Sequence, residues 1–411
     1  MTEPALHSPF IRTTQQLRAF CTRARATQRF GLDTEFISER RFSPELGIIQ
    51  VSVEEECAII DPTELTHLDV FFEILSDSCV EKVFHAGRQD LEILCRMTGR
   101  VPAPIFDTQV AAALVGYGEQ ISYARLVEET MGVTLCKSEG FTDWHARPLS
   151  QEQVEYALDD VRYLLPAAAR IREDLQSTGR LSWAEEEFAR VVDEIGVLKT
   201  PPQERYRQVR HWNSLSRRHL AVLRELASWR ETAAEEKNRP RGRVIPDEVL
   251  VELARRAPAS IEELEQIRAL NPGIVKRHAR ELLAAIERGM NVPDQDLPRI
   301  PKRKAKAAPS PGLVDLLTTV LRARAEQVRV APGILARRSE LEAIASDPDA
   351  DLDLPILQGW RYELAGHELL DVLHGIRYVG YDESEGRIKT FLREGMAKEE
   401  QADFQIPRMN V

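Results

Sequence analysis

The sequence predicts a mixed β-sheet flanked by helices, followed by two all-helical bundles. In the first 175 residues, short apolar segments rich in β-branched residues alternate with segments of helical spacing. After Leu181 such strand-like segments almost disappear. A stretch rich in proline and basic residues, "PDQDLPRIPKRKAKAAPSPG", then separates two helical regions, as linkers do. These observations place one α/β domain before two helical domains.

Three consecutive strands are expected early in the α/β domain, and a fourth follows a helix. The strand segments are "RFGLDTEF", "LGIIQVSV", "ECAIIDP" and "KVFHA". The helix "LDVFFEILSD" precedes the fourth strand, and "RQDLEILCRMTG", ending at Gly99, follows it. Further helices are expected over residues 108–117, 123–131 and 151–174.

Changes in composition set the expected domain boundaries. The amphipathic segment "WAEEEFARVVDEIGVLK" leads into "TPPQERY", which is typical of a boundary. We therefore expect one α/β domain and two helical domains joined by a basic, proline-rich linker. The α/β domain spans residues 1–200, the helical domains span residues 206–290 and 313–380, and the linker spans residues 291–312. Residues 381–411 form a C-terminal segment to which no role is assigned.

The composition is that of an ordinary soluble globular protein, with 43% hydrophobic and 29% charged residues in 411. The sequence has no run long enough to span a membrane and no apolar signal segment, which favours a cytoplasmic location. Its five cysteines are scattered, so neither a disulfide framework nor a zinc site is expected. The net charge of −11 argues against nonspecific nucleic-acid binding, although basic residues cluster over residues 237–243 and 299–306.

Four acidic residues and a tyrosine form the candidate site. Asp33 and Glu35 lie two residues apart in the apolar segment "FGLDTEF", so their side chains share one face of a strand. Two neighbouring carboxylates repel each other and are costly to bury, so a positive charge is expected beside them. Asp90 falls in the first turn of a helix, and Asp160 follows Tyr156 by four residues on another. The four acids can therefore converge at one sheet edge. Carboxylate oxygens suit Mg²⁺ or Mn²⁺ rather than zinc.

Each of these residues alone has an ordinary structural explanation. Asp90 would interact with the helix dipole, and Tyr156 with Asp160 would form a solvated helix face. Asp159 lies about 100° away from the face of Asp160. Asp107, in "PIFDTQVAAA", is expected to be the N-cap of the following helix. Only the ordered combination of motifs favours a site.

That combination resembles the DEDD exonuclease superfamily, and specifically its ribonuclease D branch. The segments "LDTEF", "HAGRQD" and "YALDD" match three family motifs, and the tyrosine of the third indicates the tyrosine subclass. The segments "FDTQVAAAL", "YARLVEETMGV" and "TDWHARPLSQEQVEYALDDVRYLLP" extend the resemblance over nearly the whole first domain. It implies a ribonuclease H-like fold. One departure is Arg88–Gln89 before Asp90, which adds a positive charge near the expected site.

The resemblance implies a 3′→5′ exonuclease that binds two divalent ions, Mg²⁺ or Mn²⁺. Asp33 would bridge the ions, Glu35 and Asp160 would complete the shell of the first, and Asp90 would hold the second through water. Tyr156 would orient the attacking water, because a phenol with an ordinary pKa of about 10 is a poor general base at neutral pH. The ions themselves would acidify the water and stabilise the leaving 3′ oxygen.

The helical regions resemble HRDC domains, modules shared by helicases and ribonuclease D. The first carries "LASWRE", "RPRGRVIPDEVLVELA" and "SIEELEQI", whereas the second matches more loosely, chiefly at "GWRYELAG". Six basic residues of the first are expected to contact RNA phosphates: Arg239, Arg241, Arg243, Lys276, Arg277 and Arg280. Any single one of them is also explained as a solvated surface residue, and Trp229 is expected in the core.

The resemblance predicts a monomeric ribonuclease that trims the 3′ ends of RNA, with tRNA precursors as the family's expected substrate and nucleoside 5′-monophosphates as products. A DNA 3′→5′ exonuclease would use the same acids, but paired HRDC-like modules disfavour it. A helicase, or any nucleotide cofactor, is disfavoured because the sequence lacks a GxxxxGK[ST] loop. Another alternative is a noncatalytic nucleic-acid-binding protein on a decayed exonuclease fold. Such a protein should have lost at least one carboxylate, and the presence of all four disfavours it.

Overall fold

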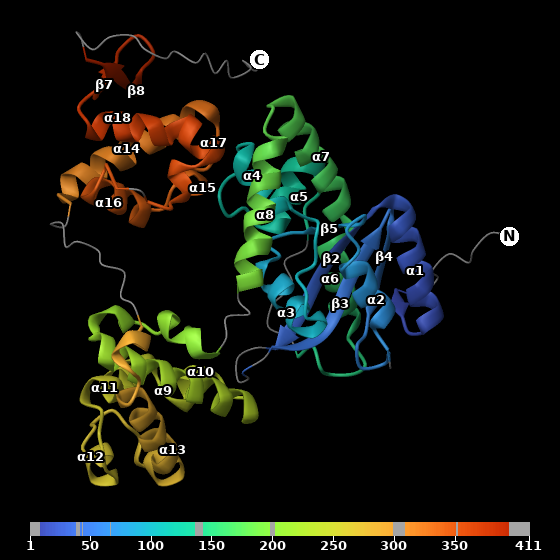
Figure 1. Cartoon of the computed structure of the whole chain (residues 1–411). Helices are drawn as coiled ribbons and strands as arrows, with labels where there is room; N and C mark the ends of the chain where they lie inside the picture. The colour runs from blue at the N-terminus through green and yellow to red at the C-terminus, as the bar shows by residue number, and fades with distance from the viewer. Residues whose placement is uncertain are drawn as a thin grey trace. The chain divides into compact units, whose positions relative to one another are not determined.

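The computed structural model describes residues 9–37, 42, 44–65, 67–135, 143–197, 202–298, 309–350 and 352–393. The chain forms two compact units. Figure 1 draws their helices and strands, coloured along the chain. The first unit comprises Met1–Thr34, Ile49–Asp193 and Lys304–Val411, and the second comprises Glu35–Ile48 and Glu194–Arg303. Residues 299–308 of the expected linker, Cys136 and C-terminal residues 394–411 lie outside the described residues. In the described parts of the chain, no helix is long and apolar enough to cross a membrane.

A six-stranded mixed sheet forms the centre of the first unit. Its strands are β1 (Phe10–Ile11), β2 (Arg29–Ile37), β3 (Glu45–Val53), β4 (Glu56–Ile60), β5 (Glu81–Phe84) and β6 (Ile105–Asp107). Their order is β1-β4-β3-β2-β5-β6. Strands β3 and β4 are antiparallel, while the pairs β1–β4, β2–β5 and β5–β6 are parallel. The four predicted strand segments are thus confirmed, and β1 and β6 are added to them.

Among the described residues, helices α1 to α8 surround the sheet, and the last residues of α8 belong to the second unit. The helices are α1 (Thr14–Thr27), α2 (Asp69–Leu75), α3 (Arg88–Thr98), α4 (Thr108–Leu114), α5 (Tyr123–Met131), α6 (Gln151–Arg162), α7 (Leu164–Ser177) and α8 (Leu181–Val197). The ring of Phe30 on β2 packs edge-on against Phe20 of α1 and Phe71 of α2, with centroids 5.8 Å and 6.2 Å away. Helices α1 and α2 therefore cover the face of β2 opposite to that of Asp33.

Two predicted helix boundaries were wrong. The single helix expected over residues 151–174 is divided into α6 and α7 at Tyr163. Pro166 explains the break, because it has no N–H to donate to the carbonyl of Arg162 and its ring would clash with that carbonyl. The helix expected over residues 108–117 ends at Leu114, shortly before Gly116, whose φ of 95° is incompatible with a right-handed helix.

The second unit is a helical bundle with its own hydrophobic core. Its elements are η1 (Pro202–Gln208), η2 (Trp212–Ser214), α9 (Arg217–Glu236), α10 (Arg241–Val244), α11 (Asp247–Arg256), α12 (Ile261–Glu265), α13 (Pro272–Met290) and η3 (Asp294–Asp296). Trp229 packs partly buried against this core, as expected. So does Phe42, which lies between β2 and β3 in sequence; its N–H donates to Asn238 Oδ1 at 3.1 Å.

The C-terminal module belongs to the first unit. Its elements are α14 (Pro311–Val328), α15 (Pro332–Leu335), α16 (Arg338–Ser346), η4 (Pro355–Leu357), α17 (Gly359–Arg361), the π-helical turn η5 (Tyr362–Gly366), α18 (His367–Leu373), β7 (Arg377–Asp382) and β8 (Arg387–Leu392). The buried Arg180, which precedes α8, donates to the carbonyls of Leu114 and Val328, both at 2.6 Å. The indoles of Trp183 and Trp360 stack with centroids 4.7 Å apart. The α/β domain and this module therefore share a packed interface.

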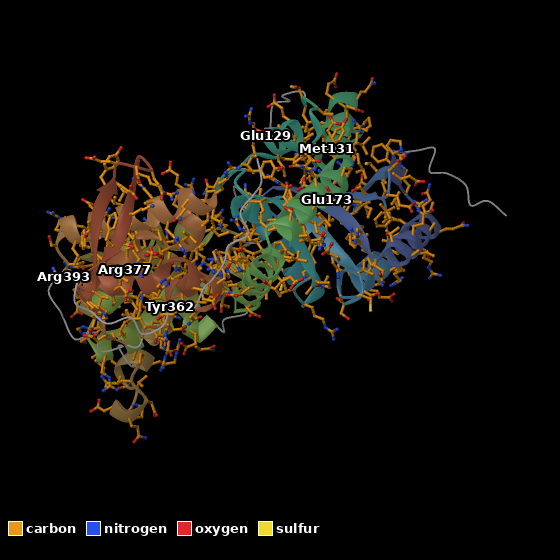
Figure 2. The ribbon with its side chains drawn as sticks, turned by 90° about the horizontal axis from the view of Figure 1, so that it is seen from above. Glu129, Met131, Glu173, Tyr362, Arg377 and Arg393 are labelled. Carbon is orange, nitrogen blue, oxygen red and sulfur yellow. The ribbon has the colours of Figure 1, made fainter. Side chains whose placement is uncertain are left out.

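The antiparallel hairpin of β7 and β8 was not expected from the sequence. Tyr378 and Phe391 stack across it, with ring centroids 5.4 Å apart. Figure 2 labels Arg377 and Arg393 at its base, where Arg377 pairs with Asp371 and the N–H of Arg393 donates to Ile376 O. Its strand sequences, RYVGYD and RIKTFL, lack the strict alternation of apolar and polar residues that marks a half-buried strand. Several of their large apolar side chains are exposed.

Candidate active site

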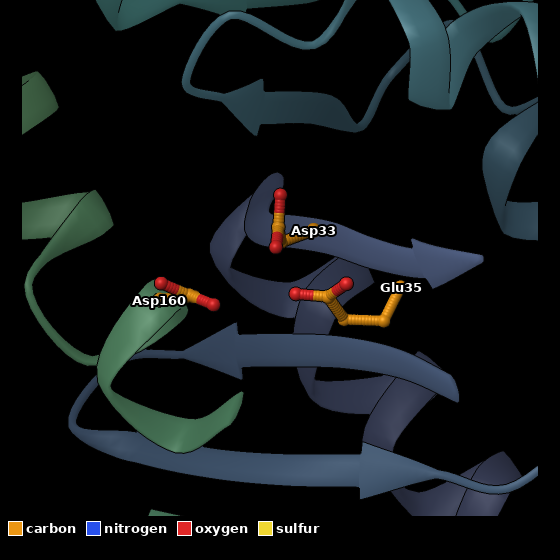
Figure 3. A group of neighbouring side chains, drawn as sticks. All are labelled: Asp33, Glu35 and Asp160. Carbon is orange, nitrogen blue, oxygen red and sulfur yellow. The ribbon is translucent and has the colours of Figure 1, made fainter. Parts of the chain in front are cut away.

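Three of the four predicted acids lie together. Asp33, Glu35 and Asp160 each offer a carboxylate oxygen, and these oxygens lie within 4.8 Å of one another. Figure 3 shows the carboxylates of the two β2 residues facing that of Asp160 on α6. All three side chains are half-buried. The alternation of β2 explains the first pair, because residues 33 and 35 point to the same face.

A glycine in β2 allows α6 and α7 to approach that face. Gly31 precedes Asp33 by two residues and therefore points the same way. A Cβ at residue 31 would lie 2.3 Å from Ser52 Oγ and 3.3 Å from Leu164 Cδ2. A side chain there would first clash with Ser52 of β3 and would also crowd Leu164, the first residue of α7. Gly31 thus helps to place Asp160, near the end of α6, opposite Asp33.

Asp90 lies apart from this cluster. It is in the first turn of α3, buried, and its carboxylate accepts a hydrogen bond from the hydroxyl of Thr34. Burial raises the pKa of Asp90 to about 6, against the opposing effect of that hydrogen bond. Thr34 lies between Asp33 and Glu35 in β2, so Asp90 lies next to the strand near the cluster. Its carboxylate is not one of the three whose oxygens lie within 4.8 Å of one another.

Asp107 fixes the approach to α3. Its side chain caps α4, as predicted, by accepting from the N–H groups of Gln109 and Val110. It also accepts from the N–H groups of Ala86 and Gly87 at 3.1 Å and 2.9 Å. These two bonds hold the turn between β5 and α3, and with it the helix start that carries Asp90.

Tyr156 and Asp160 lie one turn apart on α6, whereas Asp159 is paired with an arginine. Asp159 accepts a hydrogen bond from Arg162, which also pairs with Glu155 at 2.8 Å. The ring of Tyr156 lies 6.0 Å from that of Trp144, centroid to centroid, at 34°. Helix α6 thus places the carboxylate of Asp160 in the cluster, while Arg162 binds the carboxylate of Asp159.

Two further residues near the cluster were not identified from the sequence. The hydroxyl of Tyr123 on α5 accepts the N–H of Tyr163 at 3.2 Å. Burial, together with the charges of Asp160 and Asp33, raises its pKa, so the phenol stays neutral. The ring of His85 lies 5.5 Å from that of Tyr123, and burial lowers the pKa of His85. Both lie within the quoted family motifs, but no spacing rule connects residues 85 and 123.

The donor set of the cluster fits a divalent metal ion. Three carboxylates this close repel one another, and a bound cation removes that repulsion. Their ligand atoms are all hard oxygens, which Mg²⁺ and Mn²⁺ prefer. The cluster is therefore a candidate site for divalent metal.

The expected RNA-binding residues form two neighbouring groups on the second unit. Lys237, after α9, and His278, on α13, bring the groups together, with Nζ and Nε2 2.5 Å apart. Five of the six basic residues are exposed: Arg239, Arg243, Lys276, Arg277 and Arg280. Arg241 has an internal role instead, since it donates to both oxygens of the buried Glu231, at 2.5 Å and 2.9 Å.

Two family models match the chain. Residues 9–176 match the model described as 3′-5′ exonuclease, and residues 219–286 match that of the HRDC domain. The curated ribonuclease D of Granulibacter bethesdensis is 40% identical over 376 residues, which cover 90% of this chain and 94% of that protein. The ribonuclease D of Sphingobium indicum is 37% identical over 388 residues, covering 93% and 98% of the two chains.

Solved structures agree with these matches. The crystal structure of Escherichia coli RNase D, described as an exoribonuclease involved in structured RNA processing, superposes with a TM-score of 0.77 at 32% identity. That match covers 89% of this chain and 98% of the other. A protein from Bifidobacterium adolescentis, at 22% identity and a TM-score of 0.59, shares the fold. The predicted fold class is thus confirmed, and the chain belongs to the ribonuclease D family, with a 3′-5′ exonuclease domain followed by a helical HRDC region.

Proposed function

We propose that this protein is a 3′→5′ exoribonuclease that hydrolyses RNA one nucleotide at a time at the carboxylate cluster. The observation that carries the proposal is the meeting of Asp33, Glu35 and Asp160 on an exonuclease domain of the ribonuclease D family. Phosphodiester hydrolysis brings a negative nucleophile to a negative phosphate, so the reaction requires positive charge at that place. A cluster of carboxylates can supply it only by binding cations.

The chain's own residues have distinct roles in this proposal. Asp33, Glu35 and Asp160 would hold one divalent ion, and Asp33 with Asp90 would hold a second; both ions would be Mg²⁺ or Mn²⁺. When bound, the ions supply an acidified water molecule and neutralise charge on the phosphate. Tyr156, one turn before Asp160, orients the attacking water through its hydroxyl. Thr34 fixes Asp90 beside the strand.

The substrates we propose are tRNA precursors and other structured RNAs with a single-stranded 3′ end. The solved E. coli relative is described as acting in structured RNA processing. The domain over residues 206–290 and the HRDC-like module over residues 313–380 would hold the folded part of the RNA, while its unpaired end enters the α/β domain of residues 1–200. The products are nucleoside 5′-monophosphates. A monomeric state, a cytoplasmic location and the lack of a nucleotide cofactor complete this proposal.

A direct assay tests the proposed activity. An RNA hairpin with an unpaired 3′ tail and a 5′ label, and a DNA of the same sequence, are incubated with the protein and Mg²⁺ or Mn²⁺. The expected result is a ladder of RNA products shortened by single nucleotides from the 3′ end. Internal cuts would contradict the proposal. Preferential shortening of the DNA would support the alternative of a DNA exonuclease, and binding without cleavage would support a noncatalytic protein.

Arg239→Gln/Arg243→Gln is expected to weaken RNA binding and to flatten its salt dependence. Each phosphate contact contributes about 0.7 to 0.9 to the slope of log K against log salt, so two lost contacts lower the slope by about 1.5. Fluorescence anisotropy over a range of salt concentrations measures the slope. Arg255→Gln/Arg256→Gln is the matched control, since both arginines already pair with Glu252. A slope equal to that of this control would make Arg239 and Arg243 ordinary surface residues.

A further inference from the structure

An ion pair between distant segments connects to the tyrosine of the active site. Asp61, directly after β4, is buried, with 2% of its side chain exposed. Nε of Arg147 donates to Asp61 Oδ2 at 2.5 Å, and Thr63 donates to Oδ1 through both its N–H and its hydroxyl. Burial opposes ionisation of Asp61, but the hydrogen bonds from Arg147 and Thr63 outweigh it and lower its pKa. The pair is therefore charged and fixed at neutral pH.

Arg147 also holds the turn in which it lies. Nη1 donates to the carbonyls of Trp144 and Ala146, at 2.8 Å and 2.9 Å. One guanidinium thus joins the buried Asp61 to the backbone of Trp144. A lysine could not reproduce this arrangement, because its single ammonium cannot match the spaced donors of the guanidinium.

The same turn is secured to α6 at its other end. Ser150 and Gln153 form a capping box, in which each side chain accepts from the backbone N–H of the other. Nε2 of Gln153 also donates to the carbonyl of Asp143 at 3.3 Å. Residues 143–150 are therefore held between the end of β4 and the first turn of α6, although they form no regular helix or strand.

Trp144 connects this turn to Tyr156 through a contact between their rings. Its side chain is only 5% exposed, so it has little freedom to move within the fold. Its ring lies beside that of Tyr156, at the centroid distance of 6.0 Å. A tyrosine that aims a water molecule must keep its hydroxyl within a fraction of an ångström, which requires a rigid neighbour on its ring.

We propose that Arg147, anchored by Asp61, is a positioning residue that holds Trp144 against Tyr156 and so fixes the orientation of the Tyr156 hydroxyl in the active site. The role given to Tyr156 rests on the proposed function, whereas the dependence of its ring position on Arg147 does not. Arg147 is not assigned a contact with substrate or metal. It acts through Trp144.

The ring position is measured by ¹⁹F NMR of protein labelled with 3-fluorotyrosine. The sequence has eight tyrosines, and Tyr156→Phe assigns the resonance of residue 156. Arg147→Lys is expected to shift or broaden the Tyr156 resonance. Arg125→Lys, at an exposed arginine paired with Glu128 and Glu129, should leave it unchanged. An unaltered Tyr156 resonance in Arg147→Lys would overturn the proposal even if the protein had no nuclease activity.

A double-mutant cycle separates positioning from general stability. In single-turnover assays Arg147→Lys is expected to lower the rate constant about tenfold, with RNA affinity unchanged, and to cause no further loss in a Tyr156→Phe background. A residue that merely stabilises the fold would lower the rate by the same factor in both backgrounds, and that result would refute the proposal. Asp61→Asn, which keeps the shape of the acceptor but removes its charge, is expected to give a smaller loss with the same dependence on Tyr156. It provides the same cycle if Arg147→Lys fails to fold.

Discussion

Asp33→Asn is expected to abolish hydrolysis while RNA binding persists. Asp33 is one of the three clustered carboxylates, with Glu35 on the same strand and Asp160 on α6. Asparagine preserves the shape of the side chain but removes the charge that a divalent ion requires. Loss of bound metal removes several kcal/mol of transition-state stabilisation, which corresponds to a decrease of about a thousandfold or more in rate.

Single-turnover cleavage and RNA binding by anisotropy measure the two quantities separately. Asp69→Asn is a suitable control, because Asp69 is an acid of the same domain with 79% of its side chain exposed. This control should cleave and bind as the unmodified protein does. Near-normal cleavage by Asp33→Asn would refute the assignment of the cluster as a metal-dependent active site.

Arg361→Met is expected to destabilise the first unit by about 3 kcal/mol, because it leaves a buried charge poorly compensated. Arg361 and Glu187 form an ion pair with side chains only 3% and 1% exposed. Arg361 Nε also donates to the carbonyl of Ile334 at 2.7 Å. Arg190 still reaches Glu187 in the variant, but it is more exposed and compensates the charge less completely.

Urea denaturation followed by tryptophan fluorescence reports on this interface, since Trp183 and Trp360 stack beside the ion pair. Arg338→Met in the same C-terminal module is the control. Arg338 is 57% exposed and pairs with Asp315 and Glu342, so its loss should cost less than about 0.5 kcal/mol. Equal unfolding midpoints for the two variants would show that the buried pair does not hold the module in place.

The parts of the fold that follow local rules could be predicted from the sequence. Strand alternation placed Asp33 and Glu35 on one face, and helical spacing separated Asp160 from Asp159. The capping role of Asp107 followed from its position before an apolar helix. The break between α6 and α7 had a local signal as well, since Pro166 lies inside the helix expected over residues 151–174.

What could not be predicted depends on contacts between distant segments. Asp61 and Arg147 are 86 residues apart, and nothing in either segment indicates the other. The same holds for Arg361 with Glu187, which joins a helical module to the α/β domain. Asp90 was expected with the other acids, and its buried hydrogen bond to Thr34 depends on how α3 packs against β2. Tertiary packing determines such pairings, and the hydrophobic periodicity of the sequence contains no information about them.

Binding of Mn²⁺ to Asp160→Asn and Asp159→Asn, measured by isothermal titration calorimetry, shows whether the carboxylate cluster is the metal site. The two variants remove adjacent carboxylates of the same helix, of which only Asp160 faces Asp33 and Glu35. Asp159→Asn should bind Mn²⁺ as the unmodified protein does, because Asp159 is paired with Arg162. Asp160→Asn should bind at least about tenfold more weakly, a loss of about 1.4 kcal/mol. Equal affinities in the two variants, or a loss confined to Asp159→Asn, would contradict the claim that this carboxylate cluster is the metal site of the exonuclease.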